Sequence, residues 1–168
     1  LSANRATLTG AETATEVAGG IVCIGGPGPG KSTLGQFLCQ LHRAAFLDGQ
    51  AVAPLPEIRD TCELIRRQCV DESLTLPRMP RFPVRVELNA FAAKLADSTT
   101  RSLFDYLLQR ICQRAERELS ADDLRTWLER FPWLVVLDGL DEVPASSNRS
   151  EVLAAIQGFL VYAHCVNA

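Results

Sequence analysis

A glycine-rich stretch near residue 30 carries the side chains whose types and spacing have the clearest chemistry in this sequence. It fits the pattern G-x-x-x-x-G-K-[ST] of a phosphate-binding loop. Glycines let the backbone turn tightly, so that successive N–H groups and the positive end of a following helix surround a polyphosphate. The sequence therefore predicts a nucleotide-binding loop made by Gly25, Gly26, Gly28, Pro29, Gly30, Lys31, Ser32 and Thr33.

Individual side chains of this loop have separate predicted roles. Lys31 is expected to reach the outer phosphates, and the Ser32 hydroxyl is expected to ligate Mg²⁺. Thr33 is expected to offer its backbone N–H or its hydroxyl near the α-phosphate. Pro29 has no N–H, so the loop offers one donor fewer than a loop with another residue there.

A second candidate site follows the apolar run 133–137. That run reads as a buried strand and ends at Asp138, where a carboxylate could hold Mg²⁺ opposite the loop hydroxyl. The alternative for Asp138 is a helix cap or turn acid. Two further acids follow, and one of them could deprotonate the attacking water. Glu142 is the preferred catalytic residue and Asp141 the alternate, with an exposed turn acid as the other possibility for either.

The elements that position these residues follow from the apolar pattern. Strands are predicted at 21–24, 82–88 and 133–137, and segment 82–88 alternates apolar and charged positions, which predicts one well-buried face. Helices are predicted over 31–45, 57–69 and 100–119. Two more are predicted, one that begins after a capping box at 120–123 and one that begins after Asn148. Strands that alternate with helices indicate an α/β fold with a mainly parallel sheet. The stripe expected to be buried on the first helix is Leu34, Phe37, Leu38, Leu41 and Ala45, and that on the last is Val152, Ile156, Phe159 and Leu160.

Composition narrows the function classes. The formal net charge of −3 gives no overall attraction to nucleic acid or to an anionic membrane. The longest apolar stretch, 152–166, is too short to span a bilayer. The six cysteines are scattered without metal-ligand spacing. We therefore expect reduced thiols, a cytoplasmic location, no membrane partner and no nucleic-acid partner.

Three segments together resemble a NACHT domain of the STAND class of P-loop NTPases. They are the loop at 25–33, the run Phe-Pro-Val-Arg-Val-Glu-Leu-Asn-Ala-Phe-Ala at 82–92, and the run Leu-Val-Val-Leu-Asp-Gly-Leu-Asp-Glu-Val at 134–143. The resemblance implies a three-layer P-loop NTPase sandwich that binds ATP or ADP with Mg²⁺. In that family an ADP-bound resting form exchanges ADP for ATP, and the ATP-bound form self-associates.

The resemblance also implies how the chain is divided. Residues 1–19 are expected to end a preceding segment, and 20–168 to form the N-terminal part of the domain. The strand that follows the second site in this family would come after Ala168, so we expect the piece to belong to a larger protein and to be poorly stable alone. Few lysines and abundant alanine suggest a bacterial source.

The predicted function is ATP binding with slow Mg²⁺-dependent hydrolysis, used as a regulatory switch in a larger signalling or defence protein. The preference for ATP over GTP rests on the resemblance, because no base-reading motif is present. One alternative is an interaction module that binds nucleotide without hydrolysing it. Another is a P-loop kinase of a small molecule, although the sequence has no arginine-rich lid after a third strand.

Overall fold

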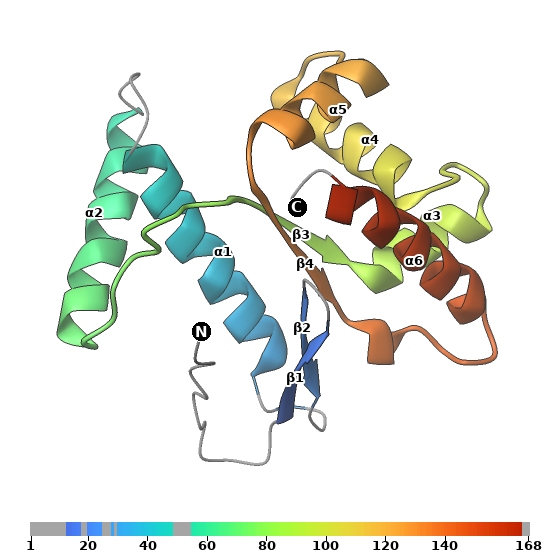
Figure 1. The fold of residues 1–168 in the computed structure, drawn as a ribbon, viewed down its shortest axis with the longest axis horizontal. Coiled ribbons are helices and arrows are strands. Elements are labelled where there is room, and N and C mark those ends of the chain that lie inside the picture. The colour runs from blue at the N-terminus through green and yellow to red at the C-terminus, as the bar shows by residue number, and fades with distance from the viewer. Residues whose placement is uncertain (1–12, 18–19, 25–27, 29, 49–54, 166–168) are drawn as a thin grey trace.

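The computed structural model describes residues 13–17, 20–24, 28, 30–48 and 55–165, in an α/β arrangement (Figure 1). A hairpin and the first two helices come first: β1 (Thr13–Val17), β2 (Gly20–Ile24), α1 (Lys31–Asp48) and α2 (Pro56–Asp71). The remaining elements are β3 (Phe82–Glu87), α3 (Leu88–Ala96), α4 (Leu103–Ala115), α5 (Ala121–Arg130), β4 (Trp133–Asp138), the 3-10 helix η1 (Leu140–Glu142) and α6 (Arg149–Cys165). Within these residues, no helix is both long and apolar enough to pass through a membrane.

The strands β3 and β4 form a parallel pair, as the sequence predicts. Their register runs from Phe82 opposite Trp133 to Glu87 opposite Asp138. Helices lie on both sides of this pair, with α1 and α2 on one side and α3, α4, α5 and α6 on the other (Figure 1). Coverage on both sides explains why β4 is an almost uninterrupted apolar run.

The expected place of strand 21–24 in a parallel sheet is wrong for the residues that the structure describes. There, β2 pairs with β1 in an antiparallel hairpin, from Thr13 opposite Ile24 to Val17 opposite Gly20. Backbone N–H and C=O groups need partners, and a segment close in sequence supplies them with little loss of chain entropy. Segment 13–17, for which no element was predicted, therefore forms a strand.

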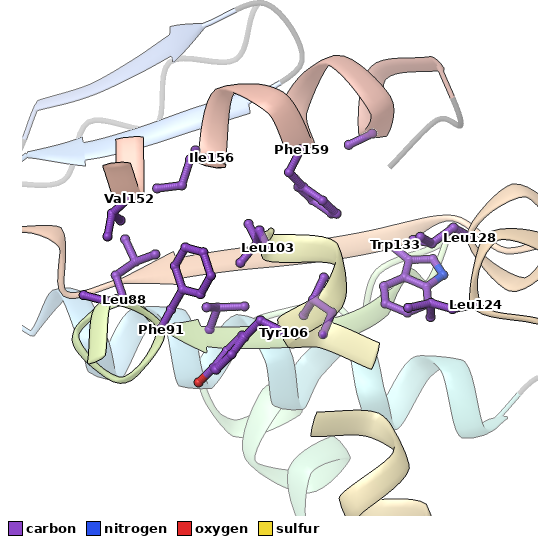
Figure 2. Packing of buried hydrophobic residues seen from close by; sticks show 14 of the residues in the cluster. Leu88, Phe91, Leu103, Tyr106, Leu124, Leu128, Trp133, Val152, Ile156 and Phe159 are labelled. Carbon is purple, nitrogen blue, oxygen red and sulfur yellow. The ribbon is translucent and has the colours of Figure 1, made fainter. Parts of the chain in front are cut away.

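The apolar core lies on the side of the β3–β4 pair that carries α3 to α6. Figure 2 shows side chains from these helices gathered on this side of the sheet, with Trp133 of β4 beside Leu124 and Leu128. The largest side chains that are at most 1% exposed are Trp133, Phe91, Leu88, Leu103, Leu107, Leu124 and Leu128. Burial of each of these aromatic and leucine side chains stabilises the folded state by roughly 1.5–3 kcal/mol. The packing on this side therefore holds the sheet together.

Several helix boundaries differ from the sequence prediction for identifiable reasons. Helix α4 begins at Leu103 rather than 100, because the Ser102 hydroxyl accepts the backbone N–H of Asp105. It ends before Glu116, whose φ of 49° is left-handed. The predicted capping box of α5 is confirmed, with Ser120 and Asp123 exchanging hydrogen bonds. Helix α3 was not predicted, because it follows β3 directly without a glycine or proline between them.

Candidate functional site

Helix α1 begins directly after the glycine-rich loop. Gly28 and Gly30 have φ angles of 92° and 87°, in the region that favours glycine, and the N–H of Leu34 donates to the carbonyl of Gly30 at 2.8 Å. Lys31 is the first residue of the helix, so the positive end of its dipole lies at the loop. The predicted binding residues Gly25, Gly26 and Pro29 lie outside the described residues.

The structure brings the Ser32 hydroxyl, in the first turn of α1, to the carboxylate at the end of β4. The Ser32 hydroxyl donates a hydrogen bond of 2.9 Å to Oδ1 of Asp138, across 106 positions of sequence. The Asp138 side chain is only 13% exposed. The two residues predicted to share a metal ion are therefore direct neighbours.

A third residue, Arg85 on β3, completes this cluster and was not predicted. Its Nε and Nη2 atoms donate to Oδ2 of Asp138 at 3.0 and 2.6 Å, and its Nη1 donates to Glu87 at 3.1 Å. The hydrogen bonds to Asp138 are the largest cause of a raised pKa of the Arg85 guanidinium, and they outweigh the opposing effect of burial. The guanidinium is therefore a permanent cation beside the carboxylate.

Strand register and a glycine on α1 explain how these groups meet. Arg85 lies opposite Val136, and Glu87 opposite Asp138. Since side chains two apart on a strand share a face, Arg85, Val136 and Asp138 lie on one face of the pair. A Cβ on Gly35 would lie 3.0 Å from Cγ1 of Val136, so α1 approaches that same face closely.

The two candidate catalytic acids have different partners. Oδ2 of Asp141 lies 4.0 Å from Nζ of Lys31, and the Asp141 side chain is 64% exposed. Glu142 accepts a hydrogen bond of 3.2 Å from the Asn89 side-chain amide. Both acids lie in η1, which follows Gly139, a residue whose φ of 79° directs the chain into the turn. Asn89 is therefore a second residue of the site that sequence reasoning missed.

The donor set suits one class of metal ion better than others. Among the described residues, no three His, Cys, Asp or Glu side chains gather into a metal cluster. Thr33, the other hydroxyl residue at the start of α1, is exposed. Mg²⁺ commonly binds through one or two protein oxygens while waters and phosphate oxygens fill its other positions. Ser32 and Asp138 fit that pattern, whereas a closed site made only of protein ligands does not fit.

Comparisons of the chain with protein-family models, curated proteins and solved structures find no match. The resemblance to NACHT domains therefore stays a prediction that rests on the three segments quoted above. The geometry of the site is independent of that resemblance, because it follows from the contacts of Ser32, Arg85 and Asp138.

Proposed function

We propose that the chain binds a nucleoside triphosphate with Mg²⁺ and hydrolyses it slowly, as the regulatory switch of a larger protein. ATP and ADP are the proposed nucleotides, and nucleotide-dependent self-association is the proposed output. The observation that carries the proposal is the 2.9 Å hydrogen bond between Ser32 and Asp138. It joins a phosphate-loop hydroxyl to a carboxylate at a strand end, which is the pair that a Mg²⁺–phosphate site requires.

Each residue of the site has a proposed task. The Lys31 ammonium neutralises the outer phosphates, and the backbone N–H groups at the start of α1 donate to phosphate oxygens. Ser32 and Asp138 hold Mg²⁺, which neutralises charge on the phosphate oxygens when it is bound. Glu142 accepts a proton from the attacking water, and Asn89 orients its carboxylate.

Titration with ATP and GTP in the presence of Mg²⁺ tests binding. We expect Lys31→Ala to weaken binding by about 30-fold or more, because it removes a charge-assisted contact of about 2 kcal/mol. Lys94→Ala is the matched control, since Lys94 is the only other lysine and lies exposed on α3. Equal binding by wild type and Lys31→Ala would contradict the proposal.

Turnover of ATP tests the catalytic assignment separately from binding. We expect Glu142→Gln to keep nucleotide affinity and to lower the turnover rate by about 10²- to 10⁴-fold, the usual contribution of a general base. Glu129→Gln, an exposed change on α5, is the control for charge. A larger loss of turnover in an Asp141→Asn variant than in Glu142→Gln would assign the general-base role to Asp141.

A nucleotide-binding module without hydrolysis is the second candidate function. This function is favoured because both candidate general bases already have protein partners. Asn89 donates a hydrogen bond to Glu142, and Nζ of Lys31 lies 4.0 Å from Oδ2 of Asp141. In that case wild type binds nucleotide, no turnover is measurable, and Glu142→Gln behaves as wild type.

A further inference from the structure

The carboxylate proposed to hold Mg²⁺ already has a protein cation on it. Oδ1 of Asp138 accepts from Ser32, while Oδ2 accepts two hydrogen bonds from Arg85. The Arg85 side chain is 24% exposed and that of Asp138 is 13% exposed, so water screens the pair only partly. The pair is therefore an ion pair within the site rather than a surface contact.

The position of Arg85 is fixed by the fold. The guanidinium lies on the face of the β3–β4 pair that α1 approaches through Gly35. Glu87 accepts its remaining bond at 3.1 Å, and the Glu87 side chain is 52% exposed. Arg85 thus has a second carboxylate beside it, which is nearer to solvent than that of Asp138.

A guanidinium and a metal ion compete for the same carboxylate oxygens, because each is a cation and the lone pairs of Oδ2 already point at Arg85. The same positive charge has the opposite effect on a nucleotide without metal. It offsets the negative charge of Asp138, which would otherwise repel the phosphates.

We propose that Arg85 is the resident counter-cation of the Asp138 site and that Mg²⁺ must displace it from Oδ2 when metal-loaded nucleotide binds. This inference rests on the proposed nucleotide-binding function. It makes Arg85 a positioning residue that sets how strongly nucleotide affinity depends on Mg²⁺. Arg85 weakens the binding of the metal-loaded nucleotide and supports the binding of the metal-free nucleotide.

The test compares the affinity for a fluorescent ATP analogue in excess Mg²⁺ with the affinity in EDTA. We expect Arg85→Gln to raise the ratio of the affinity in Mg²⁺ to the affinity in EDTA roughly 5-fold or more. A roughly 5-fold change is the lower limit of ordinary coupling between two ligands. Arg78→Gln, an exposed change of the same charge in the loop before β3, should keep the wild-type ratio. A titration with Mn²⁺ at saturating nucleotide, followed by its paramagnetic signal, should give a tighter metal site in Arg85→Gln than in wild type.

A merely structural role for Arg85 predicts a different result. Loss of stability would weaken binding equally with and without metal and would leave the ratio unchanged. Should Arg85→Gln fail to fold, Arg85→Lys replaces it, because a lysine keeps the charge but cannot make the paired bonds to Oδ2. Its ratio should rise in the same direction by a smaller factor.

The outcomes separate the two proposals. If wild type binds the analogue and neither Arg85 variant changes the ratio, the counter-cation role is wrong and the proposed nucleotide binding stands. If wild type binds the analogue neither with Mg²⁺ nor in EDTA, both are wrong. A raised ratio together with tighter Mn²⁺ binding supports the displacement of Arg85.

Discussion

The two sides of the β3–β4 pair are built differently. The side under α3 to α6 buries large apolar side chains, and Phe91, Leu103 and Trp133 are at most 1% exposed (Figure 2). On α1 the buried residues are mostly small: Gly35, Cys39, Leu41, Ala44 and Ala45. The first side supplies most of the packing that holds the sheet together, while the second keeps charged groups such as Lys31 and Arg85 partly exposed to water.

Part of the burial expected on helices α1 and α6 is not seen. Phe37 is 41% exposed and Leu38 39% exposed, although both belong to the stripe predicted to be buried. On α6, Leu160 is 53% exposed, and Ala163 is buried on the face predicted to include Leu160. Apolar periodicity thus identifies the helices correctly, but it overstates how much of each stripe the described residues cover.

The largest expected effect is a cavity on the packed side. Phe91→Ala should lower the free energy of unfolding by about 3–5 kcal/mol, because the lost contacts and the cavity add together. Phe37→Ala is the matched change on α1, where the side chain keeps much of its exposure when folded, and it should cost less than about 1 kcal/mol. Urea unfolding of both variants measures the difference. Equal losses of unfolding free energy in the two variants would mean that both sides of the sheet contribute equally to stability.

A second prediction concerns the close approach of α1 to β4. Gly35→Ala should destabilise the protein by up to about 2 kcal/mol, because the strain of a Cβ placed 3.0 Å from Cγ1 of Val136 exceeds the gain in helix propensity. If the proposed nucleotide binding is correct, the change should also weaken it, since Ser32 would move away from Asp138. Unfolding in urea and nucleotide titration check both effects.

Gly158 on α6 provides the control for this change. A Cβ there meets no atom within 4 Å, so Gly158→Ala should stabilise the protein by about 0.5–1 kcal/mol through helix propensity alone. The two alanines should therefore act with opposite sign. Stabilisation by Gly35→Ala would show that α1 does not pack tightly on β4.

The positions of Ser32 and Asp138 could be read from the sequence, because each residue lies at the end of an element in its own motif. Both residues were predicted to hold one metal ion, which stays a prediction, and in the structure the Ser32 hydroxyl lies 2.9 Å from Oδ1 of Asp138. Their positions need only a loop before a helix and an acid after a strand. These features are local, so their spacing along the chain is enough to reveal them.

Arg85 and Asn89 could not be predicted in the same way, because their roles depend on how separate segments pair. Arg85 reads in sequence as a charged position of an alternating strand. Only the parallel register, which sets Arg85 opposite Val136, places it beside Asp138. Asn89 reaches Glu142 from a helix that the sequence analysis did not predict. The hairpin of β1 and β2 likewise depends on a pairing that no local pattern specifies.

The smallest expected effect is a pH dependence that arises on the α1 side. Nδ1 of His42, on α1, accepts a hydrogen bond of 3.0 Å from the backbone N–H of Arg81. Burial, and to a lesser extent the positive charge of Arg81, lowers the pKa of His42 below its ordinary value of 6.5. The unfolded chain therefore takes up the proton at a higher pH than the folded chain. The contribution of neutral His42 to the free energy of unfolding is complete above the ordinary pKa of the unfolded chain. It is lost as the pH falls through the lowered pKa of the folded chain.

Replacement of His42 by asparagine tests this contribution, because the amide oxygen can still accept the bond from Arg81 but does not titrate. Between about pH 7.5 and about pH 5.5, the free energy of unfolding should fall less in His42→Asn than in wild type. His164→Asn, which changes the other histidine at an exposed position on α6, should keep the wild-type slope. If His42→Asn also keeps that slope, burial beside Arg81 does not hold His42 in its neutral form. The contact between α1 and the segment before β3 would then be independent of pH.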